Sequence, residues 1–388
     1  MTTRLDCEEI IRAAGFQTGY FGLLDAGFRE RLARFTGWMN EHGNLSPEQI
    51  LVARRQIIQV VVTRVLLEAD RRRIPAIAQE RIDRPIFIIG YSRTGTTLLH
   101  SLLAQDPANR VPVFWETHQP SPPPGEMPVA RGRLEAARRE FDSWCDYTPG
   151  MFAMHPYFDE GIHVPIEDEE IHSIDLQNTY PTLLFRIPTL PIASLGDTAD
   201  PSGCYAFQKL FMQQLQWNLP ARRWVVKGCA HQFQLKELFA EFPDATCVWP
   251  HRDPVEVHRS TLAISAVLYN ALTNGSVDWK QFAAGYLQAT RAGIDRVLAD
   301  PMVDDPRIVH LKFPDLARDP LAVLRRIYAA CDQPLTPQFE AAARAWLDDP
   351  AHRADRYGRY PYSLEPFGLQ AGEVAELFAD YARRFGLA

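Results

Sequence analysis

A strand, a glycine-bracketed loop and a helix follow one another without interruption early in the chain. Residues 86–89 are apolar and mostly β-branched, without alternation, which predicts a strand buried on both faces of a parallel sheet. The loop at residues 90–95 begins and ends with glycine, so its backbone can turn sharply and approach a ligand closely. Thr96 and Thr97 open an apolar helix whose free N–H groups and dipole favour an anion. With Arg93 inside the loop, this stretch predicts a phosphate cradle within an α/β sheet.

The loop differs from that of a nucleoside triphosphatase at one decisive position. That motif requires Lys directly after its second glycine, and here the residue is Thr96. The cation has moved to Arg93, which keeps a positive charge but cannot release a proton at neutral pH. The loop therefore predicts phosphate binding without the usual lysine and its magnesium arrangement. A purely structural turn is the alternative, but this run of Arg, Thr and Gly suits one poorly.

Composition excludes several classes of protein. The chain has 388 residues, 46% of them hydrophobic and 23% charged, which is typical of a globular protein with a large core. A net charge of -7 disfavours a general nucleic-acid binder. The six cysteines form no Cys-x-x-Cys pair, so we expect neither a zinc site nor a disulfide framework. We find neither a signal peptide nor an apolar run near the roughly 18 residues of a membrane helix, so we expect no membrane span and a cytoplasmic address.

Strands and helices alternate along the rest of the chain. Further strands are predicted at residues 111–114, 223–227, 245–249 and 307–311, and helices at 131–145, 205–217, 232–242, 320–331 and 371–385. This order predicts an α/β protein with a three-layer fold of P-loop type, in which helices flank a central parallel sheet. Helical extensions precede and follow that core.

Three regions are expected. Residues 1–84 form an N-terminal helical extension packed on the core, residues 85–332 the α/β core with 125–220 as an acceptor-side insertion, and residues 333–388 a C-terminal helical segment with a nucleotide-covering loop. Within the first region, Ser46-Pro-Glu-Gln has the form of a capping box that opens a long helix at 47–72. We expect that helix to pack on the sheet rather than to form a lid or a dimer surface.

Polar residues gather where the predicted strands end. Lys227 ends one strand with His231 just beyond it, and Arg252 follows another strand with Ser260 on the next helix. The carboxyl ends of strands carry the ligand in open α/β sheets, so Arg252 and Ser260 can hold a second phosphate. The acidic run at 167–170 lies near two histidines; we interpret it as a helix start in a solvated insertion rather than a metal site.

The sequence resembles the sulfotransferase family that uses 3′-phosphoadenosine 5′-phosphosulfate (PAPS). It is most similar to the bacterial branch with the pattern Arg-Thr-Gly-Thr-Thr-Leu-Leu, found here at residues 93–99. The other shared features are Trp115-Glu116 before a Pro-rich loop, Lys227-x-x-x-His231, His251-Arg-Asp-Pro before Ser260, and residues 362–369. All of them occur in the family's order.

The resemblance implies a role for each matching residue. The phosphosulfate group would lie on Arg93, Thr94, Gly95, Thr96 and Thr97, the 3′-phosphate would be held by Arg252 and Ser260, and Arg356 and Arg359 would close over the nucleotide. Arg93 and Lys227 would stabilise the leaving group in an in-line transfer, so no metal is expected.

The general base remains open between two residues. Glu116 matches a glutamate that serves as base in tyrosylprotein-type relatives, and we favour it. His231 resembles, with a shifted spacing, a histidine of the cytosolic small-molecule relatives, and His118 is a lesser candidate. The acceptor is expected to be a small-molecule hydroxyl compound, apolar or phenolic, because the region around Phe185 is rich in aromatic residues.

Two rival interpretations stay open: a P-loop-like nucleotide kinase and a catalytically inactive nucleotide-binding protein. The kinase would need the loop lysine that Thr96 replaces. The sequence does not indicate an oligomeric state.

Overall fold

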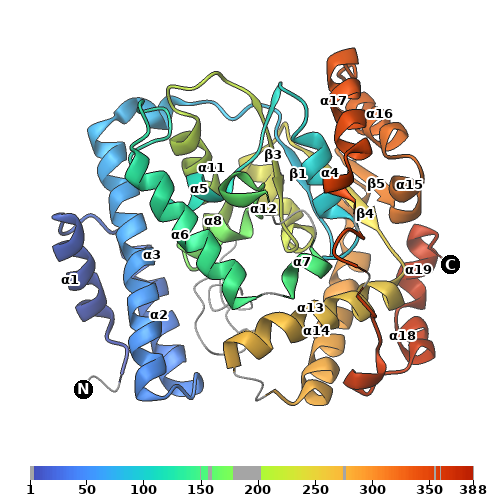
Figure 1. The fold of residues 1–388 in the computed structure, drawn as a ribbon, viewed down its shortest axis with the longest axis horizontal. Helices are drawn as coiled ribbons and strands as arrows, with labels where there is room; N and C mark the ends of the chain where they lie inside the picture. The colour runs from blue at the N-terminus through green and yellow to red at the C-terminus, as the bar shows by residue number, and fades with distance from the viewer. Residues whose placement is uncertain are drawn as a thin grey trace.

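A five-stranded parallel sheet occupies the centre of the molecule (Figure 1). The computed structural model describes residues 4–148, 150–155, 160–177, 202–273, 277–353, 355–358 and 360–387. The strands are β1 (Ile86–Ile88), β2 (Asn109–Arg110), β3 (Arg223–Lys227), β4 (Thr246–His251) and β5 (Ile308–Lys312), in the order β2-β3-β1-β4-β5. Because all the pairings are parallel, the carboxyl ends of β3, β1 and β4 lie side by side. The predicted fold class is confirmed.

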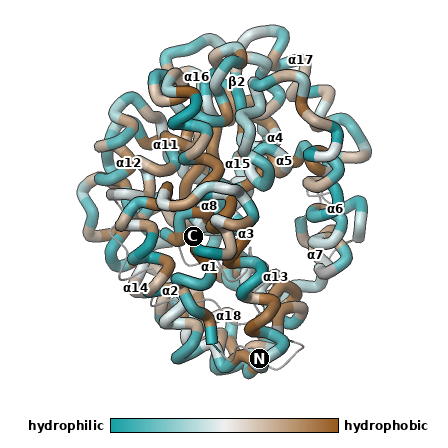
Figure 2. Tube along the Cα trace, turned by 90° about the vertical axis from the view of Figure 1, so that its left-hand side faces the viewer, coloured by the Kyte–Doolittle hydropathy of each residue, from teal (hydrophilic) through white to brown (hydrophobic). Residues whose placement is uncertain are grey.

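Both faces of the sheet are buried by apolar side chains, as the unbroken hydrophobic runs predicted. Successive residues of a strand point to opposite faces, so Phe87 and Ile89 join one core cluster while Ile86 and Ile88 join another. All four of these side chains are fully buried. Figure 2 shows this apolar interior as brown segments enclosed by more hydrophilic ones.

Helices cover each face of the sheet. The cluster with Ile86 includes residues from α4 (Thr96–Leu103), α15 (Phe313–Arg318), α16 (Pro320–Ala330) and α17 (Pro337–Asp348). The cluster with Phe87 includes residues from α8 (Glu169–Ile174), α11 (Ser202–Gln216), α12 (Leu235–Glu241), α13 (Pro254–Thr273), α14 (Trp279–Ala299), α18 (Ala371–Leu377) and α19 (Ala379–Phe385). Two of these, α18 and α19, replace the single final helix of the prediction.

The N-terminal helices form a core of their own. They are α1 (Cys7–Thr18), α2 (Ala26–His42) and α3 (Pro47–Arg73), and they stand together at one side of the molecule (Figure 1). The predicted capping box is present, since Ser46 and Gln49 each accept a hydrogen bond from the other's backbone N–H. Contrary to the expectation that α3 packs on the sheet, most of its buried apolar residues pack with α1 and α2, whereas Leu67 joins the sheet's core cluster. The apolar face of a helix is expected to be buried, but the sequence of that helix does not show which other element will cover it.

One buried carboxylate connects this helical unit to the core. Asp175 follows α8 directly and is buried. Its oxygens lie 2.6 Å from Nη2 of Arg31 on α2 and 2.9 Å from Nε of Arg64 on α3. Two helices of the N-terminal unit therefore hold the carboxyl end of α8.

The segment after α4 differs from the prediction. The second strand is β2 at Asn109–Arg110, not residues 111–114, and Phe114 begins a short helix, α5 (Phe114–His118). Pro112 has no N–H to donate to a sheet ladder, which accounts for the early end of the strand. Helices α6 (Arg131–Tyr147) and α7 (Met151–Met154) follow. No helix within the described ranges is long and apolar enough to cross a membrane.

Candidate active site

The loop after β1 depends on its two glycines. Gly90 and Gly95 have φ values of 106° and 93°, which L side chains rarely adopt. A Cβ atom at Gly90 would lie 2.6 Å from the Trp249 ring, and one at Gly95 would lie 2.8 Å from the Phe313 ring. Gly95 is also the N-cap residue of α4, and no side chain caps that helix. The first N–H groups of α4 are therefore available to an anion.

Arg93 lies at the centre of the loop in an unusual backbone conformation. Its φ is 67°, which costs a non-glycine residue about 1–2 kcal/mol. Its side chain is fixed by bonds from Nε to Oγ of Ser260 (2.8 Å) and from Nη2 to the Met154 carbonyl (2.7 Å). Strain held in this way is typical of ligand-binding loops.

The predicted second phosphate site adjoins the loop. Nη1 of Arg252 donates to the carbonyl oxygen of Arg93 over 2.9 Å, and its guanidinium lies 4.4 Å from the centre of the Phe313 ring. Ser260 reaches Arg93 from α13. The structure thus brings Arg93, Arg252 and Ser260 together at the edge where β1 and β4 end.

The C-terminal residues are placed in part. Tyr362 OH lies 3.3 Å from Nη2 of Arg93. The ring of Tyr357 lies 5.8 Å from that of Phe152 on α7, and the guanidinium of Arg356 lies 4.9 Å from the Tyr357 ring. The C-terminal segment with Arg356 and Tyr357 therefore lies beside α7, the helix whose Met154 carbonyl accepts a hydrogen bond from Arg93. Arg359 lies outside the described residues, as does the aromatic stretch around Phe185.

A second cation reaches the loop from β3. Nζ of Lys227 donates to Oγ1 of Thr97 over 3.3 Å and also contacts the carboxylate of Glu167. His155 Nε2 lies 3.2 Å from the same Thr97 oxygen. Burial, Lys227 and Arg93 hold the pKa of His155 well below its usual value, so this imidazole is neutral. Burial opposes the charge on Lys227, but Glu167 raises its pKa, so the ammonium is retained.

Both ring nitrogens of His231 are engaged away from the loop. Nε2 lies 3.0 Å from the Asp168 carboxylate and Nδ1 lies 2.9 Å from Tyr205 OH. Gln208 also donates to Asp168, over 2.6 Å. Burial opposes ionisation of Asp168, yet His231 and these bonds hold its pKa at about 2. In this geometry His231 orients the chain after β3 and has no nitrogen left for an acceptor hydroxyl.

Glu116 is likewise engaged elsewhere. Nη2 of Arg110 donates to both of its carboxylate oxygens over 3.0 Å, while the Arg110 guanidinium lies 5.0 Å from the Trp224 ring. Burial raises the pKa of Glu116 and lowers that of Arg110 in spite of this pairing. The pair lies against Trp224 near the start of β3, whereas Lys227 at the other end of that strand reaches the loop, so the carboxylate of this candidate base is committed to Arg110.

His118 lies between two carboxylates. Its ring nitrogens are 2.9 Å from Glu140 and 2.8 Å from Glu170. Although burial disfavours the charged ring, these carboxylates raise its pKa to about 10. A charged imidazole cannot accept a proton, so His118 does not serve as a base near neutral pH.

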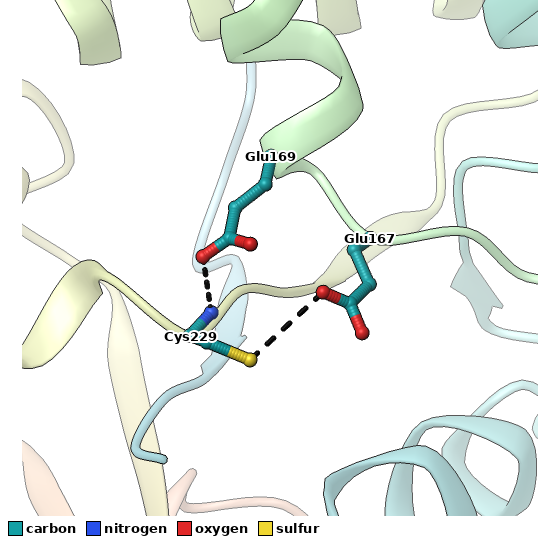
Figure 3. A group of neighbouring side chains, drawn as sticks. All are labelled: Glu167, Glu169 and Cys229. Carbon is teal, nitrogen blue, oxygen red and sulfur yellow. Dashed lines mark hydrogen bonds between the residues drawn. The ribbon is translucent and has the colours of Figure 1, made fainter. Parts of the chain in front are cut away.

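The four residues of the acidic run at the start of α8 have protein partners: Glu167 contacts Lys227, Asp168 contacts His231, Glu169 accepts from Cys229 and Glu170 contacts His118. Figure 3 shows Glu167 and Glu169 converging on Cys229, whose backbone N–H donates to Glu169 over 2.5 Å and whose Sγ lies 3.9 Å from Glu167. Potential ligand atoms of the three residues lie within 4.8 Å of one another. Burial and neighbouring carboxylates raise the pKa values of Glu169 and Cys229. We attribute the arrangement to Lys227, whose ammonium already balances Glu167.

The structure thus combines a P-loop-type fold with three cationic side chains, Arg93, Arg252 and Lys227, at the carboxyl edge of the sheet. The sulfotransferase family model matches residues 85–337. The chain therefore belongs to the sulfotransferase family, whose members are enzymes of the transferase class.

Similar proteins come from mycobacteria. The omega-hydroxy-beta-dihydromenaquinone-9 sulfotransferases Stf3 of Mycobacterium tuberculosis and Mycobacterium bovis are 28% identical over 264 residues. That alignment covers 63% of this chain and 62% of each relative, which is less than two thirds of the relatives' own length. The crystal structure of sulfotransferase STF9 from Mycobacterium avium matches with a TM-score of 0.84 and 28% identity, covering 100% of this chain and 98% of the other. STF1 from Mycobacterium tuberculosis H37Rv matches at 0.74 with 24% identity over 98% and 99% of the two chains, and supports the fold alone.

Proposed function

We propose that this protein transfers a sulfuryl group from PAPS to the hydroxyl group of a small, apolar acceptor. One observation carries the proposal: three cations converge on a single strained loop. Arg93 lies within the loop, Arg252 donates to the Arg93 carbonyl (2.9 Å), and Lys227 donates to Thr97 at the start of α4 (3.3 Å). Three cations at this edge of the sheet favour a ligand with several separate anionic groups. PAPS is such a ligand, because it carries a phosphosulfate and a 3′-phosphate.

Each cation has a distinct task in this scheme. Lys227 and Arg93 neutralise charge that develops on the phosphate oxygen as the sulfur–oxygen bond breaks, and removing one such donor typically costs about 3 kcal/mol of transition-state stabilisation. Arg252, with Ser260, binds the 3′-phosphate, where a planar guanidinium can make two parallel hydrogen bonds. Arg356 and Arg359 cover the nucleotide. These fixed charges can act without a metal.

The acceptor is proposed from the family relationship. The Stf3 relatives are named for a menaquinone that carries a hydroxyl group, which is a lipid-like alcohol. At 28% identity the same compound does not follow. We infer the broader class, an apolar alcohol or phenol.

Calorimetric titration tests the donor. We expect 3′,5′-adenosine bisphosphate, the spent donor, to bind more tightly than 5′-AMP, because only the bisphosphate engages Arg252. The Arg252→Ala variant should weaken bisphosphate binding at least tenfold and leave 5′-AMP binding unchanged. Arg318→Ala is the matched control, since Arg318 is exposed and pairs with Asp315 on the same helix. Binding of ATP without binding of the bisphosphate would overturn the proposal in favour of a kinase.

A further inference from the structure

Most titratable groups behind the loop are fully committed to other partners. Glu116 is paired with Arg110, His118 lies between two glutamates, and His231 uses both nitrogens within the protein. Glu169 is buried and accepts from the backbone of Cys229. None of these groups combines a proton-accepting atom with access to an incoming hydroxyl.

Glu167 differs from all of them. Its side chain is 36% exposed, whereas the Lys227 side chain that it contacts is 4% exposed. The same Lys227 ammonium donates to Thr97 at the start of α4. Glu167 therefore sits one side chain from the loop, with a surface open to an acceptor.

We propose that Glu167 is the general base of the transfer reaction, a role that rests on the proposed function. The acceptor oxygen attacks sulfur, and its proton passes to the Glu167 carboxylate as the new oxygen–sulfur bond forms. The bond from sulfur to the 5′-phosphate oxygen breaks, and its electron pair remains on the departing 3′,5′-adenosine bisphosphate, beside Lys227. Glu167 then releases the proton to water.

The position of Lys227 explains why the carboxylate belongs there. One buried ammonium contacts both the proton acceptor and the loop that holds the leaving group. It can thus hold Glu167 in place while stabilising the departing oxygen. The segment that carries Glu167 is itself fixed, because the Asp168 N–H donates to the Lys227 carbonyl over 2.9 Å.

The experiment measures donor consumption and donor binding separately. Release of 3′,5′-adenosine bisphosphate from PAPS is followed chromatographically with farnesol, with 2-naphthol and with water alone. A general base contributes roughly 10²- to 10⁴-fold, so Glu167→Gln should lower kcat by that factor while bisphosphate affinity stays within threefold. The fall of kcat/KM on the acid side of the wild-type pH profile should disappear in this variant.

The control variant makes the same Glu-to-Gln substitution at a salt-bridged glutamate elsewhere in the protein. Glu241→Gln removes a glutamate paired with Lys209 over 2.9 Å, away from the loop, and should leave kcat unchanged. Wild-type protein that neither binds the bisphosphate nor consumes PAPS would refute the proposed function itself. Wild-type turnover that Glu167→Gln retains within threefold would refute the role of Glu167 alone. Loss of turnover in His155→Asn, with Glu167→Gln active, would transfer the role to the histidine on Thr97.

Discussion

The buried Asp168–His231 pair predicts a measurable coupling energy. The perturbations are Asp168→Asn, His231→Phe and the double variant, where Phe keeps the ring that packs edge-on against Phe87. Burial raises the pKa of Asp168, but His231 is the largest of the contributions that lower it to about 2, so the pair stabilises the charged carboxylate. A hydrogen bond to a charged group contributes about 1.5–3 kcal/mol. We therefore expect a coupling of about 2 kcal/mol.

Urea unfolding of the four proteins, followed by tryptophan fluorescence at pH 7, gives this coupling as a double-mutant cycle. Because the folded pKa of Asp168 is depressed, its stabilising contribution is present above about pH 4 and is lost as the pH falls through about 2. A coupling below about 0.5 kcal/mol at pH 7 would refute the reasoning.

Catalysis gives the second readout of the same variants. If His231 only positions the chain after β3, Asp168→Asn and His231→Phe should lower kcat by similar factors and leave the shape of the pH profile unchanged. If His231→Phe alone abolished the acid-side limb of the profile, while the fold stayed intact, His231 would be the base after all.

Two further predictions concern the loop and α5. Gly95→Ala should destabilise the fold by about 2–4 kcal/mol, because a left-handed φ and a Cβ 2.8 Å from Phe313 both oppose the methyl group; Gly37→Ala, in a helix with nothing within 4 Å, should be neutral or slightly stabilising in the same urea assay. His118→Asn should cost up to about 5 kcal/mol at pH 6, at about 1.36 kcal/mol for each pH unit between the ordinary and the raised pKa of the imidazole. Because the pKa of His118 is raised from 6.5 to about 10, the difference from wild type should shrink between about pH 6.5 and 10 and be lost above that range. His42→Asn, at an exposed side chain, should show no such trend in unfolding experiments at pH 6 and 10.5; a difference for His118→Asn that stays constant with pH would contradict the assignment.

Local patterns were sufficient for the central strands and the loop. The run from Ile86 to Thr97 encodes its structure through residues that are adjacent in sequence, and the core strand, the glycine turns and the helix start all lie where the pattern predicts. The positions of Arg252 and Ser260 beside the loop could also be predicted from the sequence, because parallel strands bring their carboxyl ends to one edge of the sheet.

Long-range charge pairing was not readable in the same way. An acidic run such as Glu167–Glu170 suits an exposed helix start as well as a buried pair, and the choice depends on Lys227, 60 positions away. The pairing of Glu116 with Arg110 could not be read from the sequence either, because it depends on how α5 turns back toward β2 and brings the carboxylate onto the guanidinium.

The bridge at Asp175 links the N-terminal helices to the segment that carries the proposed base. The family model begins at residue 85, yet Arg31 and Arg64 lie before it and brace the far end of the helix that Glu167 precedes. A chain trimmed to the matched region would keep the loop, Arg252 and Lys227, but the helix that follows Glu167 would lose its contacts with Arg31 and Arg64. In such a truncated chain, we expect the nucleotide affinity to be retained while the reaction rate falls. The residues needed for turnover would therefore extend beyond those that the family model matches.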